Sequence, residues 1–392
     1  MNNKIIVIVS GAWPGLTSGY GIANLSTLDY FNLNTDQCIY FGPSESTISE
    51  LTKNKFPNTD FIRINFDRKS LGLRFLKSLF FKYPAITERF WRKEIFIIQG
   101  LKKRHISANS ELIFFYEDIP TAYLMQKLKN VYQHSIHLIR SHNIVYEGFK
   151  GMLSNSNFLY KQLWKIELNK IKDFERRVYK QADKFYCISD DDYESYSQSL
   201  QITPDDIIQL YIDCDRYKVN KKFTKNILFL GSADLRKSIG LKKFIDEAWP
   251  IILKSYPDVN LLLGGMNTDH FTNLKQNIHG YGFIENEIEF LSKGSIFINP
   301  QNVGSGVNLK SLIAVASGNV LISTHKGIEG TKLEDNIHCI VQDNYKEQAF
   351  KIIELMENSK LFEKYINNGR KFISNNFSRE VFLKKMDRIF SE

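Results

Sequence analysis

Short apolar runs recur along the chain and alternate with longer segments that have the apolar periodicity of helices. The strand-like runs are 5–9, 39–41, 112–116, 136–139 and 185–188 in the first half, and 226–230, 259–264, 295–298, 320–323 and 338–341 in the second. Strands that alternate with helices in this way predict parallel sheets covered by helices. The expected fold class is therefore α/β.

Length and local composition predict two domains. A chain of 392 residues is longer than one hydrophobic core usually serves. Lys, Asn and Thr replace apolar residues near 216–225, so we expect the boundary there. We assign 1–217 and 218–370 to two Rossmann-like domains, and 371–392 to a C-terminal helix.

A Gly-Ser-Gly sequence lies at the start of a helix-like segment in the second half. The run 295–298 predicts a buried strand, and 307–317 has the apolar spacing of one helix face. Gly304, Ser305 and Gly306 leave backbone N–H groups free at the helix N-terminus, where the helix dipole favours an anion. The segment predicts a binding site for a phosphate or another charged ligand.

The same segment resembles the C-terminal domain of family-four retaining glycosyltransferases of the GT-B fold. The residues that match the family pattern are Pro300, Gly304, Ser305, Gly306, Lys310, Ala314, Ala316 and Gly318. Ile313 stands where the family has a glutamate that holds the ribose of the nucleotide-sugar donor, and Ser305 and Asn319 replace a second glutamate and a proline. The departure at Ile313 leaves donor binding weaker, differently arranged or absent.

The resemblance extends over most of the chain. Residues 226–232 are similar to the strand and turn that open the donor domain, and 280–284 to the loop that meets the nucleotide base. Residues 140–143 resemble a strand end whose histidine meets the transferred sugar. As in many proteins of this fold, the C-terminal helix at 371–392 is expected to pack back on the first domain. The resemblance implies His142 and Lys237 as catalytic residues. The donor-binding residues that the resemblance implies are Gly231, Ser232, Lys237, Gly282, Phe283, Gly304, Ser305, Gly306, Val307 and Lys310.

A second glycine-rich loop, GAWPGLTSGYG at 11–21, follows the first strand. As a dinucleotide-binding fingerprint it fails, because Asn24 takes the third glycine position and no acid follows the second strand. An NAD enzyme is therefore not expected. The resemblance implies Gly19 and Gly21 as residues of a loop facing the cleft, and an ordinary strand-to-helix turn explains them almost as well.

The positive charge of the chain is concentrated in one segment. The net charge is +9, and 74–104 contains nine bases and two acids, interleaved with Phe, Tyr and Trp. A basic surface with exposed aromatic residues would suit an anionic membrane. Alternatively, the aromatic residues fill the core and the bases are only solvated. Nucleic acid is not expected, because no nucleic-acid-binding motif accompanies the segment.

Cysteine, histidine and apolar spacing predict a metal-free cytoplasmic protein. Cys38, Cys187, Cys214 and Cys339 are far apart, as expected of free thiols in a reducing compartment. The apolar run 5–9 is too short for a signal peptide, and none approaches the roughly 20 residues of a membrane span. His134 and His137 are expected on opposite faces of a strand, which argues against zinc.

The acids at 190–192 predict a helix N-cap and first turn.

We therefore expect a retaining glycosyltransferase that uses a nucleotide-sugar donor and requires no metal or other cofactor. Its expected acceptor is a glycan or a lipid-linked molecule. We also expect it to associate peripherally with the inner membrane face. Two alternatives stay open. One is a catalytically degenerate subunit that stabilises or targets a protein partner, because Ile313, Ser305 and Ser232 replace charged donor-binding residues. The other is a GT-B sugar epimerase or phosphorylase.

Overall fold

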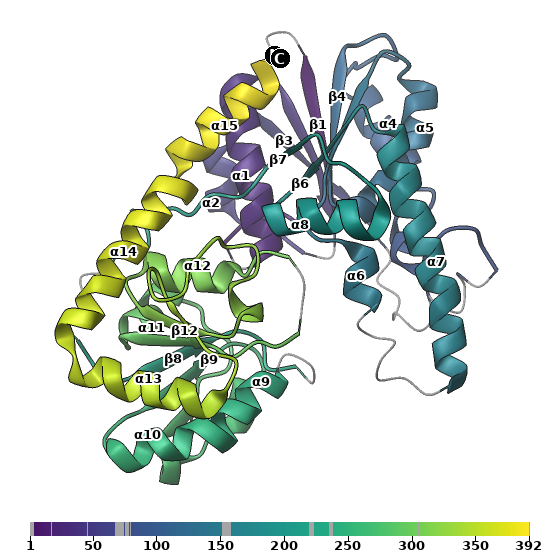
Figure 1. The fold of residues 1–392 in the computed structure, drawn as a ribbon. Helices are drawn as coiled ribbons and strands as arrows, with labels where there is room; N and C mark the ends of the chain where they lie inside the picture. Colours follow the sequence, from purple (N-terminus) through teal and green to yellow (C-terminus); the bar gives the residue numbers. More distant parts are fainter. Residues whose placement is uncertain are drawn as a thin grey trace. The chain divides into compact units, whose positions relative to one another are not determined.

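The computed structural model describes residues 4–16, 18–44, 46–66, 74, 78, 80–150, 158–218, 223–234, 238–303 and 306–391. The chain divides into two compact units (Figure 1). The first unit comprises Met1–Tyr211 and Phe382–Glu392, and the second comprises Ile212–Val381. The boundaries assigned from the sequence fall after 217 and after 370, whereas the units divide after Tyr211 and after Val381.

Packing explains both differences. Tyr211 belongs to the first unit, because its backbone N–H donates to Ser26 Oγ at 3.2 Å and its hydroxyl donates to Asp29 Oδ2 at 3.1 Å. Tyr217 belongs to the second unit, where its hydroxyl donates to Glu287 Oε2 at 3.1 Å. Helix α14 (Ser359–Phe377) packs on second-unit helices, so only α15 (Arg379–Ser391) contributes to the first unit.

The first unit is built on a seven-stranded parallel sheet with the strand order β3-β2-β1-β4-β5-β6-β7. The strands are β1 (Ile5–Ser10), β2 (Cys38–Pro43), β3 (Thr59–Ile64), β4 (Leu112–Glu117), β5 (Ile136–Arg140), β6 (Lys184–Cys187) and β7 (Asp206–Ile207). Both faces of β1 are buried: Val7 and Val9 lie in one core cluster, and Ile6 and Ile8 in another. A continuous apolar run is the expected sequence of such a strand.

Helices cover both faces of this sheet. Helices α1 (Gly19–Asn34) and α15 pack on one face, and α4 (Glu94–Lys102), α5 (Met125–Val131) and α7 (Phe158–Gln181) pack on the other. Other α-helices in the described part of this unit are α2 (Glu50–Lys55), α6 (Val145–Lys150) and α8 (Asp190–Ser195), and short 3-10 or π helices occupy Ala85–Phe90, Ile119–Leu124 and Tyr196–Leu200. Every helix that covers the sheet contributes several fully buried apolar side chains, which provides the hydrophobic driving force for this layering.

The second unit repeats the architecture with six parallel strands in the order β10-β9-β8-β11-β12-β13. The strands are β8 (Ile227–Leu230), β9 (Leu261–Gly264), β10 (Ile278–Gly280), β11 (Ile296–Asn299), β12 (Val320–Ser323) and β13 (Ile340–Val341). The α-helices among its described residues are α9 (Ser238–Lys243), α10 (Trp249–Ser255), α11 (Glu287–Ser292), α12 (Leu309–Ala316), α13 (Tyr345–Glu357) and α14. Helices α9, α10 and α13 share one core cluster with β8, β9 and β11, in which Trp249 is fully buried. The predicted α/β class with two parallel sheets is confirmed.

Candidate active site

Three neighbouring strands of the first sheet end in polar residues that form one row. Strand β1 ends at Ser10, β4 at Glu117 and β5 at Arg140, and the register pairs Ser10 with Glu117 and Glu117 with Arg140. The strand order reverses between β1 and β4. Open parallel sheets bind ligands outside the carboxyl ends of their strands at such a reversal. The row therefore lies where the first sheet is expected to bind a ligand.

Glu117 is the centre of this row. Its carboxylate is fully buried and accepts hydrogen bonds from Nε and Nη2 of Arg140 at 3.0 and 3.1 Å. The hydroxyl of Thr27, which lies on α1, also donates to it. Burial raises the pKa of Glu117, but the Arg140 guanidinium and the hydrogen bonds from His142 and Thr27 outweigh this effect and hold the pKa below its ordinary value. The carboxylate is therefore ionised at neutral pH.

His142, which the sequence selected as a catalytic residue, joins the same cluster. It follows β5 by two residues, and its Nε2 lies 2.7 Å from Oε2 of Glu117. The Tyr20 ring packs over the imidazole with 4.4 Å between ring centroids, and the Tyr20 hydroxyl donates to the backbone carbonyl of Glu117 at 2.7 Å. Only 9% of His142 is exposed. The structure thus orients His142 with a buried acid that sequence reasoning missed.

The next residue along β4 has a strained backbone. Asp118 has a φ of 83°, which is rare for a residue other than glycine and is commonly retained at functional sites. Its carboxylate accepts a hydrogen bond from Ile119 N at 2.9 Å. Burial raises the pKa of Asp118, and the hydrogen bond from Ile119 N and the nearby Arg89 guanidinium oppose this effect. Two acids thus lie side by side in sequence at the carboxyl end of the central strand, with pKa values shifted in opposite directions.

The first glycine loop closes around the start of α1. Helix α1 begins at Gly19, its N-cap Ser18 accepts a hydrogen bond from Gly21 N at 3.0 Å, and Gly15 N donates to the carbonyl of Gly21 at 3.1 Å. Gly21 is buried, and a Cβ there would lie 2.8 Å from the Gly15 carbonyl oxygen. A tight turn therefore accounts for Gly21, whereas Gly19 is exposed.

Other polar residues singled out in the sequence have structural roles. His137 is buried and hydrogen-bonded to Tyr116 and Ser135, and burial lowers its pKa to about 3. His134 lies before β5 and is exposed, so the expectation that both histidines occupy one strand is wrong. The acids at 190–192 form the first turn of α8, and the N-cap is Ser189. All four cysteines are free. Across the described ranges, no group of three His, Cys, Asp or Glu residues could hold a metal ion.

In the second sheet, the strand order reverses between β8 and β11. Gly231 directly follows β8, and its backbone N–H donates to the carbonyl of Gly264 at 2.9 Å. Lys310 is the second residue of α12, and a Cβ on Gly231 would lie 3.6 Å from its Nζ. The ammonium group also lies 5.4 Å from the centroid of the Phe229 ring. A lysine from α12 therefore reaches the carboxyl end of β8, at the reversal point.

The loop at 280–284 is attached to the same edge through Gly265. Gly265 has a φ of 122°, its N–H donates to the carbonyl of Gly282 at 2.7 Å, and a Cβ on it would collide with the backbone of Gly231. Gly282 has a φ of 65° with no atom within 4 Å of a Cβ position, and Phe283 is 66% exposed. Gly231 and Gly282 are thus brought together by a glycine that sequence reasoning did not select. Ser232, which follows Gly231, is half-buried.

The N-terminus of α12 is fixed by buried amide side chains. Asn308 is the N-cap, but its side chain makes no capping bond, because Nδ2 donates to the Lys326 carbonyl at 2.8 Å. Asn299 at the end of β11 donates to Ser311 Oγ at 2.8 Å and anchors the first turn of the helix. A lysine in a first turn opposes the helix dipole, whereas an anion bound at this helix N-terminus would offset the charge of Lys310.

The remaining predicted donor residues fall into three groups. Gly306 has a φ of 81°, and Val307 packs against the backbone of Gly330. Ile313, which the sequence resemblance aligns with a glutamate, is 3% exposed and lies in the core. Lys237, Gly304 and Ser305 lie outside the described residues.

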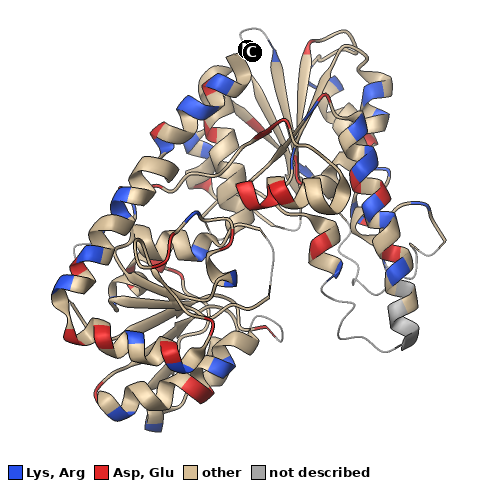
Figure 2. Ribbon diagram, in the orientation of Figure 1, with Lys and Arg blue, Asp and Glu red and all other residues tan. Residues whose placement is uncertain are grey.

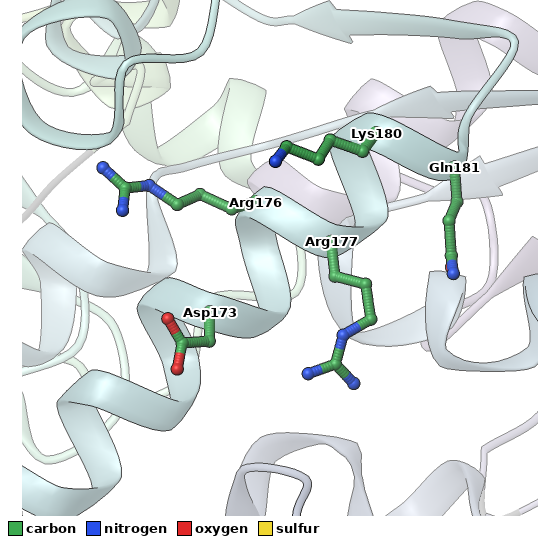
Figure 3. Close-up of a pocket in the computed structure, with 5 residues that line it drawn as sticks. All are labelled: Asp173, Arg176, Arg177, Lys180 and Gln181. Atoms are coloured by element: carbon green, nitrogen blue, oxygen red, sulfur yellow. The ribbon is translucent and has the colours of Figure 1, made fainter.

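A surface pocket of the first unit lies away from the carboxyl ends of its strands. Arg176 donates to the carbonyl of Leu200 at 2.9 Å, and Arg177 packs over the Tyr83 ring at 5.5 Å. The pocket is lined by Asp173, Arg176, Arg177, Lys180 and Gln181, all on α7 (Figure 3). Because α7 ends just before β6 begins, the pocket lies towards the amino-terminal edge of the sheet, opposite the carboxyl ends.

The second unit can be assigned to a family. Residues 224–358 match the sequence model of the family described as glycosyl transferases group 1. The second unit carries a glycosyl transferases group 1 domain. This domain contains Gly231, Gly265, Gly282 and Lys310, so the strand-end site just described lies within it.

Comparison with solved structures shows that the glycosyl transferases group 1 domain is part of a GT-B architecture. HepE from Anabaena, in complex with UDP, has a TM-score of 0.69 and 10% identity, with 99% of each chain covered. Sucrose-phosphate synthase from Thermosynechococcus elongatus has a TM-score of 0.70 and 14% identity, with 99% of this chain and 98% of that one covered. WaaG, a glycosyltransferase involved in lipopolysaccharide biosynthesis, has a TM-score of 0.69 and 13% identity over 98% of this chain and all of the other.

One curated relative matches part of the chain, including first-unit sequence. It is an uncharacterized 44.6 kDa protein in the cps region of Klebsiella pneumoniae, 24% identical over 259 residues. The match spans 62% of this chain and 66% of the relative, just under two thirds of its length.

Proposed function

We propose that this protein is a retaining, family-four glycosyltransferase that transfers a sugar from a nucleotide-sugar donor to an acceptor. The observation that carries the proposal is the position of Lys310. Its ammonium group lies at the carboxyl end of β8, beside Gly231 and at the reversal point of the sheet, within the glycosyl transferases group 1 domain. A cation beside a helix N-terminus suits the diphosphate of a nucleotide sugar.

The proposed chemistry requires stabilisation of negative charge on the leaving nucleoside diphosphate. Lys310 and the backbone N–H groups at the start of α12 would supply it, together with Lys237 as the family resemblance implies. Fixed charges and dipoles of this kind are usually the largest catalytic term. Because a lysine and a helix N-terminus can neutralise the diphosphate, the proposed reaction uses no metal or other cofactor. The complex of HepE with UDP supports a uridine nucleotide as the first donor to test.

Calorimetric titration with UDP- and GDP-sugars tests this proposal. We expect saturable binding by the wild-type protein that Lys310→Met weakens about tenfold, or ~1.4 kcal/mol. The matched control is Lys346→Met, because Lys346 is also the second residue of its helix, α13, and is exposed. It should leave affinity unchanged. Equal affinities for wild type and Lys310→Met would remove Lys310 from the donor site.

A catalytically degenerate subunit is the second candidate, and Ile313 favours it. Its side chain fills the core where the family glutamate would hold the donor ribose, so α12 offers no carboxylate there. If no nucleotide sugar binds to the folded protein, the degenerate candidate replaces the transferase.

The proposed acceptor is a lipid-linked precursor of a surface glycan at an anionic membrane surface, on the cytoplasmic side. The relative in a cps region supports a role in polysaccharide synthesis. Within the predicted basic segment, Phe90 is buried in the core, but Phe80, Phe81, Ile95 and Phe96 are 48–87% exposed. Figure 2 shows further Lys and Arg residues along α7. The described helices include none that is both long and apolar enough to cross a membrane.

Sedimentation with anionic liposomes tests the membrane proposal. We expect co-sedimentation at low salt that weakens as ionic strength rises, because bases near an anionic surface each gain on the order of 1 kcal/mol and are screened by salt. Ile95→Ser/Phe96→Ser should reduce it severalfold. Phe350→Ser, on an exposed position of α13, should not. Failure of the wild-type protein to sediment would exclude the membrane proposal.

A further inference from the structure

We propose that Glu117 is a positioning residue that fixes the tautomer and orientation of His142, so that Nδ1 of the imidazole is presented as a hydrogen-bond acceptor for a hydroxyl group of the sugar substrate or acceptor. The inference rests on the proposed glycosyltransferase function for its ligand class. Its structural basis is independent of that function, because every residue involved belongs to the first unit.

The location of the proton follows from the partners of His142 Nε2. This atom lies 2.7 Å from Oε2 of Glu117 and 3.4 Å from Nη2 of Arg140, and the much shorter contact with the carboxylate decides its role. An ionised carboxylate can only accept hydrogen bonds, so Nε2 must carry the proton that bridges the two groups. When one ring nitrogen of a neutral histidine is a donor, the other has a free lone pair. Nδ1 is therefore the acceptor of the neutral imidazole.

The carboxylate is itself held in place. Arg140 donates to both of its oxygens at 3.0 and 3.1 Å, Thr27 donates to Oε1, and both Glu117 and Arg140 are fully buried. Glu117 and Arg140 are also register partners on neighbouring strands. With the oxygens fixed by donors from two other elements, Glu117 cannot rotate to release Nε2. The orientation of His142 is thus set before any ligand arrives.

The remaining ring nitrogen is available to a ligand. In the described part of the chain, no side chain or backbone group is hydrogen-bonded to Nδ1 of His142. This nitrogen is not one of the fully buried polar atoms that lack a partner, so its edge of the ring is accessible. The side chain retains 7% exposure although Tyr20 covers one face of its ring. The accessible edge of His142 therefore presents an acceptor, at the sheet position where a ligand is expected. A hydroxyl group, which can donate to this nitrogen, is the matching ligand class.

Nitrogen-15 NMR of the imidazole rings tests the assignment, because the shifts of Nδ1 and Nε2 distinguish the two tautomers. His142→Gln identifies the signal among the eight histidines. We expect neutral His142 to be protonated on Nε2 in the wild-type protein and in Thr27→Val, which keeps the carboxylate. Glu117→Gln should move the proton to Nδ1 in a large share of molecules, because the amide group can donate to Nε2. If this variant does not fold, Glu117→Gln/Arg140→Met removes both charges of the buried pair and is analysed in the same way.

Two results would overturn the proposal: protonation on Nδ1 in the wild-type protein, or an unchanged tautomer in whichever folded variant lacks the Glu117 carboxylate. Neither of these results depends on nucleotide-sugar binding. If no donor binds but His142 has the expected tautomer, only the transferase function is rejected. With an identified donor, Glu117→Gln should lower kcat about tenfold or more with little change in KM for the nucleotide sugar, since it acts through His142.

Discussion

Replacing Glu117 with alanine is expected to lower the free energy of unfolding by about 3–5 kcal/mol. Removal of the carboxylate leaves the Arg140 guanidinium, which is fully buried, without its counter-ion. One nitrogen of that guanidinium, Nη1, already lacks a hydrogen-bond partner within the described ranges. A cost of this size is a large fraction of the stability of an ordinary domain. Urea unfolding at pH 7 measures it.

Glu111→Ala is the matched control, because Glu111 immediately precedes β4 at its opposite end and is exposed. An exposed substitution of this kind should change stability by no more than about 0.5 kcal/mol. Equal losses in the two variants would contradict the account of Glu117 and Arg140 as a coupled buried pair.

Stability of the first unit should fall as pH rises from about 4.5 to 8, because of Glu175 on α7. Burial raises its pKa from 4.5 to about 8, although it accepts hydrogen bonds from Val145 N and Tyr146 N at 3.0 and 3.1 Å. In this window the unfolded chain has lost the Glu175 proton and the folded chain retains it, so rising pH favours unfolding. At 1.36 kcal/mol per pKa unit, the full shift corresponds to about 5 kcal/mol.

Urea unfolding across this pH range, compared between the wild type and Glu175→Gln, measures the effect. The variant cannot ionise, so its stability should lack this pH-dependent loss. Asp173→Asn serves as the control, since Asp173 lies on the same helix and is exposed. If Glu175→Gln and wild type lose stability in parallel, Glu175 is not the group responsible.

The strands that could be predicted are those buried on both faces. The run 5–9 became β1 at Ile5–Ser10 and the run 112–116 became β4 at Leu112–Glu117, because a doubly covered strand must be apolar throughout. Strands β3, β7 and β10 were not predicted. Strands β3 and β10 lie at sheet edges, and β7 has only two residues, Asp206 and Ile207. Backbone pairing with a neighbour, which leaves little trace in the sequence, defines these strands.

Sequence reasoning selected residues at these strand ends only where a family motif covered them. The resemblance identified His142, Gly231 and Lys310, and the structure places each at the carboxyl edge of a sheet. It did not identify Glu117, because the pairing with Arg140 depends on strand register between segments more than 20 residues apart. A signal was nevertheless present: Ser10, Glu117 and Arg140 each end an apolar run with a polar residue.

The first unit is completed by a helix that follows the whole of the second unit in sequence. Phe382 and Met386 of α15 lie in the same core cluster as Leu28 and Phe31 of α1. During synthesis, residues 212–381 emerge from the ribosome before α15 does. While the second unit is being made, the first sheet therefore lacks one of the helices that cover it, whereas separate domains generally fold in the order in which they are made. A helix that is translated after the second unit therefore completes the core of the unit that was translated first.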